Sequence, residues 1–89
     1  MIRKKLKIIN KLGLHARAAM KLTNLAGRYQ SDIRIAYHQR EVSVKDIMDV
    51  MVLAVSVGNE IELIVSGEDE NEAAKAVEEL INNRFGEEI

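Results

Sequence analysis

The chain reads IRKKLKIINKLGLHARAAMKLTNLA over residues 2–26, and the spacing of its apolar residues changes midway along this stretch. In the first half, Ile2, Leu6 and Ile8 share one parity and basic residues occupy most of the other, which is typical of a half-buried strand. Over residues 16–26 small and apolar residues recur every three or four positions, as on one face of a helix. The stretch therefore predicts a strand, a loop and a helix in succession.

The remaining two thirds of the chain continue this alternation of strands and helices. The predicted elements are strands over residues 32–37, 41–44 and 61–65 and a helix over residues 47–54. A last helix follows Asp69, which stands three residues before Glu72 as in a capping box, and its apolar stripe runs to about Phe85. The order is β-α-β-β-α-β-α, which predicts an α+β fold with three helices on one face of a mostly antiparallel sheet.

Length, composition and charge exclude several classes of protein. The chain has 89 residues, of which 47% are hydrophobic and 30% charged, so we expect one small domain over residues 1–89. The net charge of −1 does not favour a nucleic-acid binder, and the chain has no apolar run long enough to span a membrane. Because cysteine is absent, disulfides and thiolate chemistry are excluded. The cytoplasm is the default expectation for the location.

One histidine stands where the first loop becomes the first helix. Gly13 permits an unusual backbone turn just before it, and His15 is followed by the helical run that begins at Ala16. The first four N–H groups of a helix lack partners within the helix and, with the helix dipole, form a site for anions. A phosphoryl group on His15 would meet these groups, and Arg17 could add a charge-assisted hydrogen bond. The same positive end favours the neutral imidazole, whose lone pair can attack phosphorus.

Simpler explanations of these residues stay open at this level. A single histidine at a helix start is often only a tolerated polar residue, and no second histidine, carboxylate pair or serine lies nearby in sequence to complete a triad or a metal site. His38 falls in the predicted turn between two strands, where we interpret it as a solvated residue. The element order without the last helix would also suit a ferredoxin-like or ligand-sensing module, so fold alone does not determine function.

Two separated motifs resemble those of a known family. Gly13-Leu14-His15-Ala16-Arg17 followed by two small residues is similar to the active-site signature of the HPr family, the histidine phosphocarrier proteins of the bacterial phosphoenolpyruvate-dependent phosphotransferase system. Lys45-Asp46-Ile47-Met48-Asp49-Val50-Met51-Val52-Leu53 resembles the second signature, at the expected distance. The resemblance implies an open-faced β-sandwich with a four-stranded sheet.

The resemblance also implies a mechanism and its residues. Enzyme I phosphorylates the Nδ1 atom of the histidine, and the carrier passes the phosphoryl group to an enzyme IIA. On this basis His15 is the acceptor and Arg17 stabilises the phosphate. The carrier needs no metal and no other cofactor, and it is a relay component rather than an enzyme. We expect it to act as a monomer, without nucleic acid and without insertion into a membrane.

At two positions the chain departs from the common family pattern. Most members have proline where this chain has Ala18. The resulting motif is similar to that of the nitrogen-related branch, often named NPr. Many members have a regulatory serine where this chain has Asp46, which lacks the hydroxyl that a kinase would modify. Aspartate is as good an N-cap as serine, so we predict that Asp46 caps the second helix. Partial mimicry of phosphoserine is the alternative, and Ser43 is a weak substitute target.

The resemblance places a docking face around the histidine. We use this name for Met20, Ile47, Met48 and Met51. Methionine suits surfaces that accept several partners, and we expect Met20 and Met48 to be partly exposed. Alternatively, Met51 belongs to the core. Basic residues that could surround this face are Lys21, Arg28 and Lys45, whereas Asp49 would weaken that rim.

The physiological output stays open from the sequence. The relay could serve sugar uptake or a regulatory cascade of the nitrogen type. The missing serine and Ala18 favour the regulatory or Gram-negative type. A different class of function is a pure interaction module that binds regulatory proteins, although the presence of His15 argues against a role without phosphorylation.

Overall fold

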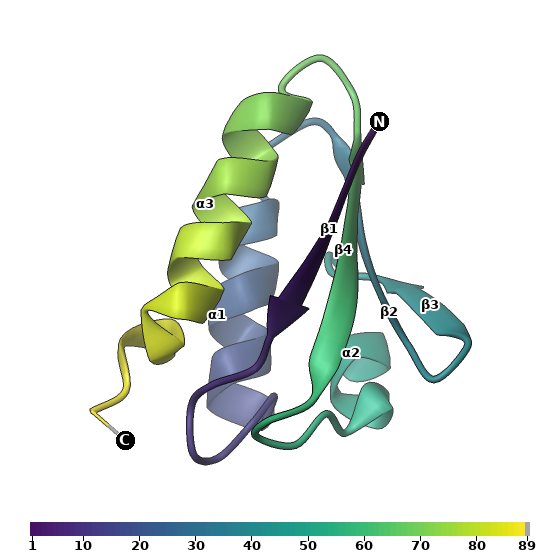
Figure 1. Ribbon diagram of the computed structural model, residues 1–89. Coiled ribbons are helices and arrows are strands. Elements are labelled where there is room, and N and C mark those ends of the chain that lie inside the picture. Colours follow the sequence, from purple (N-terminus) through teal and green to yellow (C-terminus); the bar gives the residue numbers. More distant parts are fainter. Residues whose placement is uncertain (89) are drawn as a thin grey trace.

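The computed structural model describes residues 1–88. One four-stranded sheet and three helices account for most of this range (Figure 1). In chain order, the elements are β1 (Ile2–Lys7), α1 (Ala16–Ala26), β2 (Asp32–Tyr37), β3 (Arg40–Ser43), α2 (Ile47–Leu53), β4 (Glu60–Ser66), α3 (Glu70–Asn82) and the 3-10 turn η1 (Arg84–Gly86). The strand order is β1-β4-β2-β3, and every neighbouring pair is antiparallel. These observations confirm the predicted α+β class and its element order.

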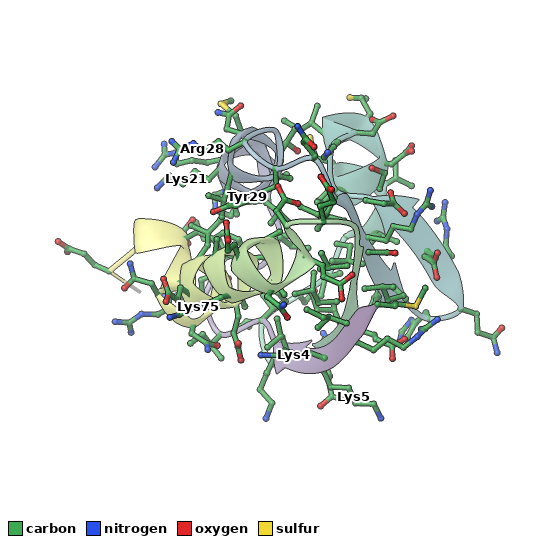
Figure 2. All side chains as sticks on the ribbon, turned by 90° about the horizontal axis from the view of Figure 1, so that it is seen from above. Lys4, Lys5, Lys21, Arg28, Tyr29 and Lys75 are labelled. Carbon is green, nitrogen blue, oxygen red and sulfur yellow. The ribbon has the colours of Figure 1, made fainter. Side chains whose placement is uncertain are left out.

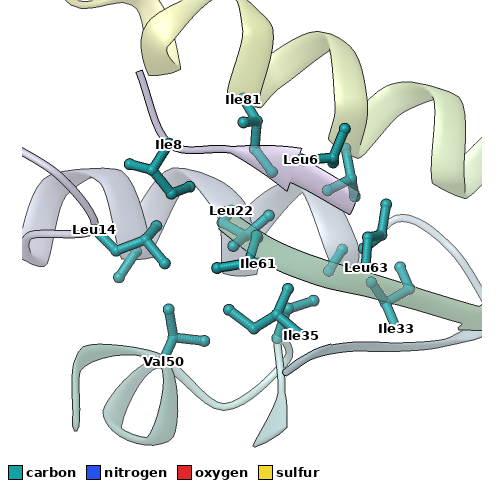
Figure 3. Close-up of a cluster of buried hydrophobic side chains, with 14 of the residues drawn as sticks. Leu6, Ile8, Leu14, Leu22, Ile33, Ile35, Val50, Ile61, Leu63 and Ile81 are labelled. Atoms are coloured by element: carbon teal, nitrogen blue, oxygen red, sulfur yellow. The ribbon is translucent and has the colours of Figure 1, made fainter. Parts of the chain in front are cut away.

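The helices lie on the side of the sheet to which the apolar parity points. Leu6 pairs with Ile61 and Ile35 pairs with Leu63, so apolar side chains of adjacent strands meet on the same face. Figure 3 shows these side chains gathered with Leu22 of α1 and other apolar residues of the three helices. α1 and α3 run side by side along this face, and α2 lies near its end beside α1 and β3 (Figure 1). Burial of this apolar face is the main stabilising contribution to the arrangement.

The opposite face of the sheet carries charged residues. Arg3 of β1 pairs with Glu62 of β4 at 3.2 Å, and Arg34 of β2 pairs with Asp32 at 2.8 Å. These pairs are exposed, so each contributes little to stability. No helix in residues 1–88 is both long and apolar enough to cross a membrane.

The predicted capping box at the start of α3 is wrong. Asp69 occupies the N-cap position, but its carboxylate accepts hydrogen bonds from the backbone N–H of Gln30 and of Ser31, at 2.9 Å each, and from the Ser31 hydroxyl. The side chain of Glu70 accepts from the Gly67 N–H at 3.1 Å. Asp69 thus ties the α1–β2 connection to α3, because the fold brings three donors of Gln30 and Ser31 to its carboxylate.

The predicted end of α3 is also wrong. The helix stops at Asn82, and the backbone turns where Arg84 and Phe85 adopt positive φ angles of 56° and 54°. Phe85 is fully buried in this turn, although it does not continue the helix. Smaller differences concern β3, which spans Arg40–Ser43 instead of residues 41–44, and α2, which ends at Leu53.

Candidate functional site

His15 occupies the N-cap position of α1. Its backbone is extended, with φ −78° and ψ 179°, and its carbonyl accepts the first helical hydrogen bond from the Ala19 N–H at 2.8 Å. The ring caps none of the helix N–H groups within residues 1–88, and the side chain is 26% exposed. The first turn, residues 16–19, contains no acidic side chain. The positive end of α1 therefore lies beside a partly exposed imidazole without an acid of its own first turn to neutralise it.

The loop before His15 is held from two sides. Leu14 is buried in the core, and its N–H donates to the Val55 carbonyl at 2.9 Å. Gly13 has a φ of 69°, and a Cβ added there would lie 2.4 Å from the same carbonyl oxygen. Only glycine combines this backbone conformation with so close an approach. The glycine that the sequence marked as a turn thus lets the α2–β4 connection contact the histidine loop.

A carboxylate from the far end of the chain contacts the His15 ring. One oxygen of Glu87 lies in hydrogen-bonding contact with His15 Nε2, and the other accepts from Asn10 Nδ2 at 3.1 Å. Desolvation acts to raise the pKa of Glu87, but the hydrogen bonds from His15 and Asn10 and the charge of Lys21 outweigh it, so its pKa lies below the usual value. Glu87 could not be predicted from the sequence, because it is 72 residues from His15 and no local pattern marks it.

Asn10 also was missed, and it connects the same parts. This residue is fully buried, and its Nδ2 donates to the Gly13 carbonyl at 2.7 Å as well as to Glu87. Its burial and its two hydrogen bonds arise from the tertiary structure, so no local sequence pattern marks this residue. Asn10 therefore links the position of Glu87 to the loop that carries His15.

Within residues 1–88, Arg17 forms no hydrogen bond or ion pair with His15. It lies in the first turn of α1 and is exposed, so its guanidinium is available to an anion placed at the helix start. Its predicted role in stabilising phosphate remains a prediction.

A shallow hollow of about 310 Å³ adjoins the His15 ring. Its lining comes from the histidine loop, the end of α2 and the connection to β4, namely Leu12, Leu14, His15, Ala16, Met51, Ala54, Val55 and Ser56. The hollow joins the two sequence motifs that resembled the HPr signatures. His15 therefore shares this hollow with residues of α2 and of the connection to β4.

The predicted partial exposure of Met20 and Met48 is confirmed. Met20, Met48 and Met51 are 52%, 64% and 38% exposed, and Ile47 is half-buried. The core position that Met51 could have taken belongs to Val50, which is fully buried. Leu12 and Val52 are further exposed apolar residues, outside the docking face as defined.

Two residues of the predicted basic rim have partners within the chain. Lys21 Nζ donates to the Phe85 carbonyl at 2.7 Å, and Lys45 Nζ donates to the Tyr29 carbonyl at 2.8 Å. Lys21 and Arg28 lie on the side of α1, whereas Lys4 and Lys5 extend from β1 on another side of the molecule (Figure 2). Lys21 and Lys45 therefore also hold backbone carbonyls of distant segments, which the sequence did not predict.

Asp46 caps α2 as predicted. Its carboxylate accepts from the backbone N–H of Met48 at 3.1 Å and of Asp49 at 3.3 Å.

His38, in the β2–β3 turn, is exposed and stacks on Tyr37 with 3.9 Å between ring centroids. No group of three potential metal ligands occurs in the described part of the chain.

Comparison with known proteins agrees with this geometry. The family model described as PTS HPr component phosphorylation site matches residues 2–83. The phosphocarrier protein HPr of Cupriavidus necator is 49% identical over 87 residues, covering 98% of each chain. The crystal structure of HPr-C-His from Thermoanaerobacter tengcongensis superposes with a TM-score of 0.96 at 42% identity over the whole of both chains. A structure described as an HPr dimer from the same organism gives 0.79 at 41% identity, covering 98% of this chain and 100% of that one.

These matches cover the histidine loop, the α2 segment and the whole antiparallel sheet. The similarity is therefore one of sequence, fold and site position together. The chain belongs to the HPr family, the phosphocarrier proteins of the phosphotransferase system, which relay a phosphoryl group rather than catalyse a reaction of their own.

Proposed function

We propose that this carrier accepts the phosphoryl group on His15 from phosphorylated enzyme I and passes it to an enzyme IIA. The observation that carries the proposal is the position of His15 at the N-terminus of α1, partly exposed and within the matched phosphorylation-site segment. The other histidine, His38, stacks on Tyr37 in the β2–β3 turn and is not at the N-terminus of any helix within residues 1–88.

The chemistry requires a ring nitrogen with a free lone pair. This nitrogen attacks phosphorus, an N–P bond forms, and the bond between phosphorus and the donor breaks with its electron pair staying on the donor. The new phosphoryl oxygens face the unpaired N–H groups in the first turn of α1, and Arg17 adds a charge-assisted hydrogen bond. Transfer to the next acceptor reverses these steps.

The docking face supports a surface shared by successive partners. Of its exposed methionines, Met51 lines the hollow beside His15, and flexible thioether side chains can adapt to different apolar surfaces. Because enzyme I and enzyme IIA must each reach the same ring in turn, one adaptable surface suits both better than two separate ones. We place this exchange in the cytoplasm and assign it to a monomer, whose docking face stays open.

For the physiological output, we favour a regulatory or Gram-negative type of relay. Asp46 has no hydroxyl to receive a regulatory phosphate, and its carboxylate is engaged with the N-terminus of α2. Regulation by phosphorylation of a serine at this position is therefore absent.

The test is phosphorylation in vitro with phosphoenolpyruvate, magnesium and enzyme I. We expect an acid-labile, base-stable phosphoryl group on the native protein, its loss in His15→Ala and its retention in His38→Ala. Addition of an enzyme IIA is expected to remove the label from the carrier. A native protein that stays unlabelled, or a label that persists in His15→Ala, contradicts the proposal.

A further inference from the structure

Resting on the proposed function of His15, we propose that Glu87 is a positioning residue that holds the ring proton on Nε2 and so leaves Nδ1 as the nucleophile. A neutral imidazole has one N–H and one lone pair, and which nitrogen carries the proton is decided by the hydrogen bonds that it makes. The ionised carboxylate of Glu87 can only accept, so its contact with Nε2 assigns the proton to that nitrogen.

The second ring nitrogen is available for chemistry. The His15 side chain caps none of the N–H groups of α1 within the described residues, so no helix donor occupies Nδ1. The ring is one-quarter exposed beside the hollow that Met51 and Ala54 line in part. A lone pair on Nδ1 therefore remains for an incoming phosphorus atom, while Nε2 is engaged on the other edge of the ring.

The carboxylate of Glu87 is held by more than the histidine. Its side chain is only 11% exposed, and its second oxygen accepts from Asn10 Nδ2. Since the same Nδ2 also donates to the Gly13 carbonyl, a buried asparagine joins the carboxylate to the loop that orients His15. The low pKa of Glu87 keeps this carboxylate ionised at neutral pH.

The turn that ends the chain delivers Glu87 to this place. Phe85 is buried in the core and its carbonyl accepts from Lys21 Nζ, while the Glu87 N–H donates to the Arg84 carbonyl at 2.9 Å. Gly86, with a φ of 77°, lets the backbone reverse between them. Burial of Phe85 and two hydrogen bonds thus fix the segment that follows α3.

The charges balance during transfer. When neutral His15 attacks through Nδ1, the product ring carries the phosphoryl group on Nδ1 and keeps its proton on Nε2, so the ring gains one positive charge. The adjacent carboxylate compensates that charge, as the carboxylate partner of a catalytic histidine does in other acid–base sites. When the phosphoryl group leaves, the lone pair returns to Nδ1 and the original tautomer is restored.

The decisive experiment measures the ring tautomer by ¹⁵N NMR of His15 in the unphosphorylated protein, at a pH where the ring is neutral. We expect the Nε2–H form to dominate in the native protein and in Glu87→Gln, whose amide oxygen can still accept. In Glu87→Ala we expect a shift toward a mixture of both forms. Glu88→Ala, a change at the exposed neighbour, is the matched control and is expected to keep the native spectrum.

The same variants are then phosphorylated by enzyme I. We expect Glu87→Ala to slow phosphorylation at saturating carrier on the order of tenfold or more, with partial rescue in Glu87→Gln and no change in Glu88→Ala. A native spectrum dominated by Nδ1–H, or a Glu87→Ala variant that matches Glu88→Ala in tautomer and rate, overturns the inference. Absence of any label on native His15 would instead refute the proposed function, and the NMR result alone would then decide whether Glu87 sets the tautomer.

Discussion

The N-termini of α1 and α2 differ in capping: a side chain of its own N-cap residue pairs with the backbone N–H groups of α2, but not with those of α1. Asp46 turns its carboxylate back onto its own helix and accepts from two backbone N–H groups, and Asp49 adds a second acid to that first turn. His15 occupies the same position on α1, but its ring turns away from the helix and contacts Glu87. A helix that is capped by its own acid has fewer backbone donors left for a foreign anion than an uncapped helix has. This difference supports the proposal that the phosphoryl group is received at the N-terminus of α1 and not at that of α2.

The largest effect is expected when α1 receives the same N-cap residue that α2 has, an aspartate. In His15→Asp we expect complete loss of the phosphohistidine label and no loss of stability, because aspartate is a favoured N-cap and histidine is not. Labelling with enzyme I and urea denaturation measure the two effects. A marked fall in the free energy of unfolding would show that the His15 ring contributes more to the fold than the comparison allows.

Removing the cation near the uncapped end is expected to have the next largest effect. Arg17→Ala is predicted to slow transfer from enzyme I roughly 10- to 100-fold, since a hydrogen bond to a charged group is worth about 1.5–3 kcal/mol. Lys75→Ala removes a cation from α3 and serves as the control (Figure 2). Equal rates for the two variants would remove Arg17 from the phosphate site.

The close approach of the histidine loop to the α2–β4 connection can be broken at Gly13. Gly13→Ala is expected to destabilise the protein by about 1–3 kcal/mol, because alanine disfavours positive φ and its Cβ would clash with the Val55 carbonyl. Gly58 also has a positive φ, of 88°, but open space surrounds it, so Gly58→Ala measures the backbone strain alone. Urea denaturation that gives equal losses for both variants would contradict the clash.

At α2 the cap itself is open to test. Asp46→Ala is expected to lower the free energy of unfolding by about 1 kcal/mol, whereas Asp46→Ser is expected to change it little. Denaturation curves measure this, and phosphorylation of His15 by enzyme I is expected to be unaffected in Asp46→Ser. A changed rate in that variant would favour the alternative in which Asp46 imitates a phosphoserine.

The third helix extends the comparison, because Asp69 stands at its start yet serves a distant loop. The hydrogen bond from the Ser31 hydroxyl, helped by the Gln30 N–H, holds the pKa of Asp69 below its usual value of 3.8. A carboxyl group whose pKa is lower in the folded state stabilises the fold above its unfolded pKa, and this contribution is lost as pH falls through the folded value.

We therefore expect native stability to fall more steeply than that of Asp69→Asn when the pH is lowered from neutral to about 3. Urea midpoints at several pH values measure the difference. Parallel curves for the two proteins would show that the Asp69 carboxylate does not couple folding to pH.

Much of the fold was predictable because its signals are local. Alternating apolar positions in Ile2–Lys7 and Glu60–Ser66 identify strands with one buried face, and three- and four-residue spacing identifies α1 and α3. The errors came where tertiary contacts overrode local preference. Asp69 looked like a cap but found donors in another loop, and Phe85 continued the apolar stripe but is buried through a turn instead of a helix.

The sequence by itself determined the order of the elements, the position of His15 at a helix start and the cap at Asp46, because each depends on residues within a few positions of one another. Only the tertiary structure decided which atoms meet the His15 ring. Glu87 lies 72 residues away and reaches Nε2 through the turn after α3, with Asn10 and Lys21 holding that turn in place. Spacing along the chain carries no information about such a contact, since it depends on how α3 packs against the sheet and where its helix ends.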